Sequence, residues 1–100
     1  METIIIKVKE VMESDIAVSI TKCSKLLKKI DNEVRIGNKL IIDFNGINII
    51  TFDFIKTLLV HINNKYDMGE LVEFKADDED IMERIETVKK NIEKIEDRKK

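Results

Sequence analysis

The chain has 100 residues, of which 43% are hydrophobic and 38% charged, and its 18 basic and 20 acidic side chains give a formal net charge of −2. This length supports one domain around a single core, so a second domain is excluded, and the near-neutral charge argues against direct binding to nucleic acid. We expect a cytoplasmic protein without a membrane span, because no apolar run approaches about 20 residues, the N-terminal residues do not resemble an export signal, and the one cysteine has no partner.

Apolar side chains at every second position predict that the chain begins with a strand. Ile4, Ile6 and Val8 alternate with residues that include two lysines, so we expect a half-buried strand at about residues 3–10. Residues 16–20 fit either a second short strand or an early beginning of the next helix, and the strand is the preferred interpretation.

A long helix is expected next, because the following apolar residues recur every three or four positions. Ser19 or Thr21 is suited to cap its beginning, and Gly37 is suited to end it. The side chains expected on its buried face are Cys23, Leu26, Leu27, Ile30 and Val34.

The middle of the chain is expected to alternate between strand and helix. Residues 40–44 are almost all apolar, as in a strand that is covered on both faces at the centre of a sheet. After a glycine turn, a helix is expected over about residues 54–64, with Thr51 or Asp53 as its N-cap. A further strand is expected at residues 71–75.

An acidic block precedes a final helix, whose apolar side chains are spaced four and three residues apart. That spacing suits packing against the sheet of the same chain, and it equally suits a seam between two helices. Packing on the sheet of the same chain is the preferred interpretation, with a homodimer through Ile92 and Ile95 as the alternative. Residues 97–100 are expected to fray. The buried stripe of this helix comprises Ile81, Ile85, Val88, Ile92 and Ile95.

The predicted order of elements is β-β-α-β-α-β-α. Strands joined through a helix are normally parallel neighbours with right-handed crossovers, so the helices must cover at least one face of the sheet. We therefore expect an α/β sandwich, a single domain over residues 1–100, with a mixed sheet and helices packed mainly on one face.

Few residues suit catalysis, which needs a proton carrier, an activated nucleophile or a metal. His61 is the only histidine and is expected at the flank of a helix, and Cys23 is expected on an apolar face, where a thiol acts as a small hydrophobe. The sequence has no zinc-type spacing of Cys and His, no calcium loop and no glycine-rich phosphate loop. We therefore expect a non-enzymatic binding protein without a metal or cofactor.

The most informative stretch is residues 41–55, where a strand is followed by a glycine turn, a short apolar segment and a polar helix start. This stretch resembles the STAS domains (sulphate transporter and anti-sigma factor antagonist), and more closely the small bacterial STAS-like domains. The resemblance in element order covers about residues 3–95, whereas the specific motif spans only residues 41–55. The positions that fit the motif are Asp43, Phe44, Gly46, Ile47, Thr51 and Phe54.

The resemblance implies a regulator that works by partner switching. In anti-sigma factor antagonists, a serine at this helix start is phosphorylated by a histidine-kinase-like ATPase that is also the antagonist's partner, and the added charge ends the complex. By position that serine falls on Asp53, so the switch is absent, fixed in a charged state or moved to Thr51. Mimicry would be partial, because a phosphate carries about −1.5 to −2 charge. The alternative is that Asp53 only caps the helix.

The residues around this helix start suggest a contact surface for a protein partner, either that ATPase or another switch protein. Phe52 and Phe54 are two positions apart and point in different directions, so one ring is expected to be exposed. The alternative is that Phe52 closes the core at the edge of the sheet. The predicted partner-binding residues are Thr51, Phe52, Asp53, Lys56 and Val60.

The acidic block offers a rival hypothesis of a different class. It is a small acidic inhibitor or decoy, of phage or mobile-element origin, that mimics nucleic acid and blocks a basic binding site. A simpler interpretation is that the block is solvated and favours the dipole of the helix that it precedes. The residues of this alternative surface are Asp77, Asp78, Glu79, Asp80 and Glu83.

Overall fold

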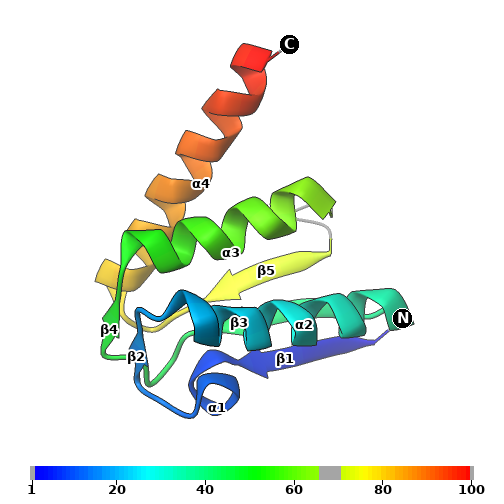
Figure 1. Ribbon diagram of the computed structural model, residues 1–100, viewed down its shortest axis with the longest axis vertical. Coiled ribbons are helices and arrows are strands. Elements are labelled where there is room, and N and C mark those ends of the chain that lie inside the picture. Colours follow the sequence, from blue (N-terminus) through cyan, green and yellow to red (C-terminus); the bar gives the residue numbers. More distant parts are fainter. Residues whose placement is uncertain (1, 66–70, 100) are drawn as a thin grey trace.

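The computed structural model describes the backbone of residues 2–65 and 71–99, and their side chains as far as residue 92 (Figure 1). The α/β class is confirmed. The described elements follow the order β-α-β-α-β-β-α-β-α, which adds one short helix and one short strand to the expected order. The strands are β1 (Thr3–Lys7), β2 (Ile16–Ala17), β3 (Lys39–Asp43), β4 (Ile49–Ile50) and β5 (Val72–Lys75), and the helices are α1 (Val8–Met12), α2 (Ile20–Ile36), α3 (Phe52–Lys65) and α4 (Glu79–Lys99).

The described strands form two parallel sheets. One contains β1, β3 and β5 with β3 in the centre, and the other contains β2 and β4. In the larger sheet, Leu40 of β3 lies beside Ile4 of β1 and Val72 of β5. Every pairing between described strands is parallel, whereas the sequence predicted a mixed sheet. The reason is that each pair is joined through a helical crossover, which returns the chain in the same direction.

Helices cover one face of the larger sheet. Ile6, Leu40 and Ile42 are buried on this face, and Figure 1 shows α2 and α3 side by side across it. On the opposite face Ile5 is 54% exposed, and its neighbour Ile41 is only half-buried. The helices therefore pack mainly on one face, and the expectation that β3 is covered on both faces is wrong.

The first strand is shorter than predicted, because helical and strand patterns overlap at its end. β1 ends at Lys7, and α1 begins at Val8, whose side chain is buried together with that of Met12. A spacing of four residues places these two side chains on one face of a helix, so Val8 fits both patterns. The helix ends at Met12, and its C-cap Glu13 adopts a left-handed φ of 55°.

The segment after α1 contains β2 and the beginning of α2, so both interpretations of it hold in part. Ser19 is the N-cap of α2, since its hydroxyl oxygen accepts a hydrogen bond from the backbone N–H of Lys22 at 3.3 Å. Gly37 ends the helix with a φ of 103°, a conformation that glycine adopts without strain. The predicted cap and the predicted end of this helix are confirmed.

α4 packs along α3 through its apolar stripe. The stripe is buried within the chain as far as Ile92, but its main partner is α3, so the prediction that this helix packs on the sheet is wrong. Ile92 is therefore not available to a second copy, and Ile95 lies outside the described side chains. The helix continues to Lys99, through positions that were expected to fray. In the part of the chain that the structure describes, none of the helices has the length and apolar character needed to cross a bilayer.

Candidate functional site

The turn between β3 and β4 is built by residues of the STAS-like motif. The Oδ1 atom of Asp43 accepts a hydrogen bond from the backbone N–H of Asn45 at 2.9 Å, which stabilises the turn. Gly46 adopts a φ of 88°, and the side chain of Lys9 lies against it. Phe44 is buried with its ring centroid 6.4 Å from that of Phe74. These residues therefore have structural roles.

The N-cap of α3 is Thr51. Its Oγ1 atom accepts a hydrogen bond from the backbone N–H of Phe54 at 3.2 Å, so the helix begins at Phe52, two residues earlier than predicted. Asp53 is in the first helical turn with its side chain exposed, and it is not the cap. The hypothesis that Asp53 only caps the helix is wrong, although a negative charge in the first turn still favours the helix dipole.

The two phenylalanines at this helix start differ sharply in exposure. Phe52 is 53% exposed, whereas Phe54 is fully buried at 0%. Phe52 therefore does not close the core. The guanidinium carbon of Arg84 on α4 lies 5.8 Å from the centroid of the Phe52 ring, and its Nη1 atom donates a hydrogen bond to the carbonyl oxygen of Ile50 at 2.8 Å. Arg84 thus holds the exposed ring against α4 by a cation–π contact.

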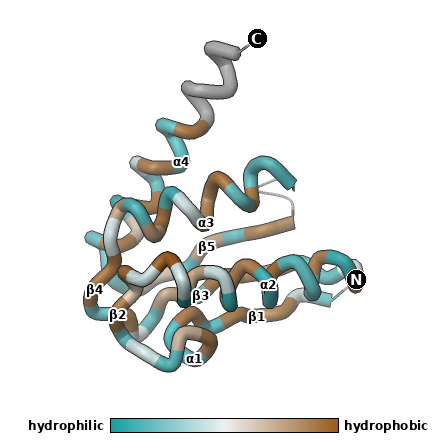
Figure 2. The backbone as a smooth tube through the Cα atoms, in the orientation of Figure 1, coloured by the Kyte–Doolittle hydropathy of each residue, from teal (hydrophilic) through white to brown (hydrophobic). Residues whose placement is uncertain are grey.

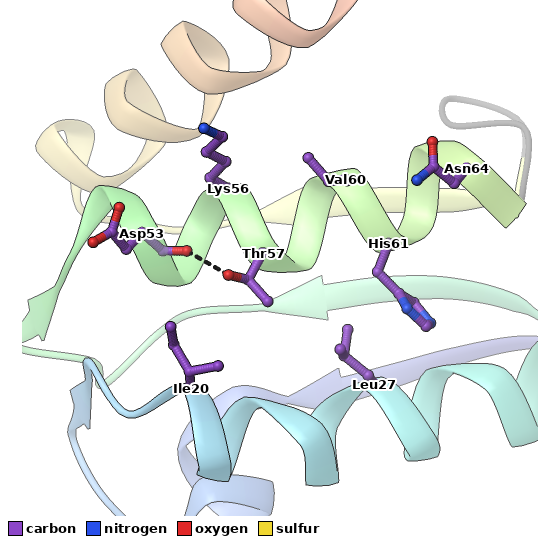
Figure 3. Close-up of a pocket in the computed structure, with 8 residues that line it drawn as sticks. All are labelled: Ile20, Leu27, Asp53, Lys56, Thr57, Val60, His61 and Asn64. Carbon is purple, nitrogen blue, oxygen red and sulfur yellow. Dashed lines mark hydrogen bonds between the residues drawn. The ribbon is translucent and has the colours of Figure 1, made fainter.

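A groove lies between α2 and α3 (Figure 3). Figure 3 shows Thr57 and His61 of α3 directed towards α2, and Ile20 and Leu27 of α2 directed towards α3. Three of the predicted partner-binding residues line this groove, but Phe52 does not. Phe52 instead lines a second hollow, between α3 and α4. The residues of the groove are Ile20, Leu27, Asp53, Lys56, Thr57, Val60, His61 and Asn64.

Asp31 of α2 contacts two residues of α3 beside the groove. His61 is half-buried at the flank of α3, and its Nε2 atom lies 3.0 Å from Oδ1 of Asp31 on α2. The Nζ atom of Lys65 is 3.4 Å from Oδ2 of the same carboxylate. The sequence predicted the flank position of His61 but missed Asp31, because 30 positions separate these residues and no local pattern links them.

The residues of the acidic block have different roles. Asp78 caps α4, since its Oδ1 atom accepts hydrogen bonds from the backbone N–H groups of Asp80 at 2.9 Å and Ile81 at 3.3 Å. The backbone N–H of Asp77 donates to Oδ1 of Asn45 at 2.7 Å. Asp80 and Glu83 line the same hollow as Phe52. The two surfaces that the sequence analysis treated as alternatives therefore meet beside Phe52.

Apolar side chains are exposed around β2 and β4, where Figure 2 shows hydrophobic residues along the chain. Ile16 and Ile49 are register partners in the two-stranded sheet and are exposed, whereas the following pair, Ala17 and Ile50, is buried. Because these strands are parallel, they bring the beginnings of α2 and α3 close together. We call this region the β2–β4 surface; its exposed apolar residues are Ile16, Val18, Ile20, Ile49 and Phe52.

The burial of the Cys23 thiol can be tested by the pH dependence of the stability of the chain. It is fully buried on α2, and this burial raises the pKa of its thiol from an ordinary value of 9.0 to about 11. The folded chain therefore favours the neutral thiol. The contribution of the buried thiol to the stability is fully present below about pH 9, and it is lost as the pH rises towards about 11. We expect the stability of the wild type relative to Cys23→Ala to fall by about 2 kcal/mol over this range.

Urea unfolding of both proteins at about pH 8 and about pH 11 measures this difference. Titration of the lysines affects both proteins, so it cancels when the two are compared. A difference in stability that does not change with pH would contradict the burial of the thiol.

Comparison of the chain with protein-family models, curated proteins and solved structures finds no match. Within the described residues, no group of three or more His, Cys, Asp or Glu side chains is arranged to hold a metal ion.

Proposed function

We propose that the chain is a non-enzymatic, STAS-like interaction domain that binds a protein partner through the start of α3. The observation that carries the proposal is the exposure of Phe52, which is 53% accessible at the first position of the helix. Exposed aromatic side chains beside other exposed apolar residues are typical of protein interfaces. The proposed contact residues are Thr51, Phe52, Asp53, Lys56 and Val60.

The structural roles of the motif residues support this proposal. Asp43 and Gly46 form the turn, Thr51 caps α3, and Phe54 is in the core. Phe52, which is not one of the motif positions, is left at the surface with Asp53 beside it. The motif residues thus support the helix start, and Phe52 and Asp53 remain at the surface, where a partner can contact them.

The proposed partner is a histidine-kinase-like ATPase or another switch protein, the class that the STAS-like resemblance implies. A carboxylate does not accept a phosphate from a Ser/Thr kinase, so the proposed interaction does not depend on phosphorylation at residue 53. Asp53 instead supplies a constant negative charge in the first turn of α3.

The test is affinity capture from an extract of the native host, with the wild type, Phe52→Ala and Asp53→Lys as baits. We expect recovery of the main partner to fall at least about tenfold with either variant, because aromatic residues near an interface centre carry much of the binding energy. Ile36→Ala is the matched control, since Ile36 is 71% exposed at the other end of α2. Equal recovery by all four baits would contradict the proposed contact.

The acidic decoy hypothesis predicts a different pattern in the same experiment. Its complex would survive Phe52→Ala, but it would be lost at moderate salt and on neutralising the whole acidic block, because exposed charges are screened by ions. The residues of this block are Asp77, Asp78, Glu79, Asp80 and Glu83. Capture that is lost with Phe52→Ala therefore favours the proposed function over the decoy.

A further inference from the structure

The hollow between α3 and α4 combines an aromatic ring with carboxylates. It has a volume of about 390 Å³ and is lined by Phe52 of α3 and by Asp80, Glu83, Arg84 and Thr87 of α4. The ring of Phe52 forms one wall, and the two carboxylates are on exposed residues. An aromatic face beside negative charge is a suitable environment for a cationic group.

The hollow is lined by two carboxylates and by the cation of Arg84. No ion pair between described residues engages Asp80 or Glu83. Arg84, which lines the same hollow, donates to the carbonyl oxygen of Ile50 and contacts the ring of Phe52. The two acidic groups therefore remain available to a cation supplied from outside.

Phe52 lines the hollow and is also part of the β2–β4 surface, so the two regions are adjacent. Two residues before Phe52, the strand β4 ends, and its exposed Ile49 lies in register with the exposed Ile16 of β2. An incoming segment that contacted both the hollow and the β2–β4 surface would meet carboxylates and exposed apolar side chains. Such a segment needs apolar side chains to match the β2–β4 surface. It also needs a basic side chain, whose charge is complementary to the carboxylates.

We propose that the partner binds through a segment that places an Arg or Lys side chain in the hollow, with adjacent apolar side chains on the β2–β4 surface. The incoming cation lies in the hollow beside the Phe52 ring and near the carboxylates of Asp80 and Glu83. This inference rests on the proposed function and names the chemistry of the partner. A second copy is a poor occupant, because an isologous contact places the same acidic surface on both sides.

The test uses a phage-displayed library of random peptides, selected on the immobilised full chain. We expect the selected peptides to contain Arg or Lys next to apolar residues. A selected peptide and its analogue with glutamine at each basic position are then synthesised, and their dissociation constants are measured by fluorescence anisotropy. We expect the analogue to bind at least about tenfold more weakly than the parent peptide.

Variants of the chain locate the binding. Phe52→Ala and the double variant Asp80→Asn/Glu83→Gln are each expected to weaken binding of the parent peptide at least about tenfold. Glu86→Gln is the matched control, because Glu86 is an exposed acid on the same helix that does not line the hollow. All of these residues are exposed, and circular dichroism confirms that each variant keeps its fold.

The outcomes separate this inference from the proposed function. Peptides that need Phe52 but contain no basic residue, or that bind the double variant as well as the wild type, overturn the cationic partner and leave the start of α3 as the contact. Failure to select any peptide whose binding depends on Phe52 counts against both. An equal loss with Glu86→Gln would show a general effect of charge and would also overturn the assigned hollow.

Discussion

Phe54→Ala is expected to lower the free energy of unfolding by about 3–5 kcal/mol, whereas Phe52→Ala is expected to lower it by less than about 1 kcal/mol. The two residues have the same side chain and are separated by one position, yet Phe54 is fully buried and Phe52 is 53% exposed. Truncation of Phe54 leaves a cavity beneath α3. Truncation of Phe52 removes only partial burial and one contact with Arg84.

Urea unfolding followed by circular dichroism measures both losses. Because a loss of about 5 kcal/mol can remove the whole stability of a domain at the lower end of roughly 5–15 kcal/mol, Phe54→Leu provides a smaller step in the same direction. The prediction fails if the two alanine variants are equally destabilised, since that result would mean that both rings are buried. It would also remove the basis of the proposed contact.

Ile85→Ala is expected to destabilise the chain by about 2–5 kcal/mol. Ile85 is fully buried at the centre of the stripe by which α4 packs on α3, so its truncation removes apolar contacts between these helices. The measurement is again urea unfolding, with Glu86→Ala as an exposed neighbour whose effect is expected to stay within about 0.5 kcal/mol.

A small effect of Ile85→Ala would show that α4 does not pack on its own chain. In that event the stripe would be free for a seam between two copies, and the midpoint of unfolding would depend on protein concentration. A large effect that is independent of concentration agrees with packing within one chain.

The parts of the fold that could be predicted are those with a local pattern. α2 was predicted because its apolar residues recur with helical spacing over many turns, and because Ser19 and Gly37 are suited to its two ends. β3 was predicted from its apolar run. α1 and β4 were missed, since a helix of five residues and a strand of two residues are too short to establish a period.

The candidate site could be predicted only in part. The spacing of Phe52 and Phe54 indicated that one ring would be exposed, but the position of the cap at Thr51 decided which one. The meeting of Phe52 with Asp80 and Arg84 could not be predicted, because it depends on how α4 lies against α3. Contacts of this kind are set by packing between distant segments and have no local signature in the sequence.

The parallel arrangement of the strands also affects how the chain folds. Paired residues lie 32 to 36 positions apart in all three described pairings, as in Leu40 with Val72, Ile16 with Ile49 and Thr3 with Lys39. None of these pairings can begin as a hairpin, so each requires closure of a long loop before any strand hydrogen bond forms. Folding should therefore be slower than in a helical bundle of the same size, with early helices and late joining of the strands.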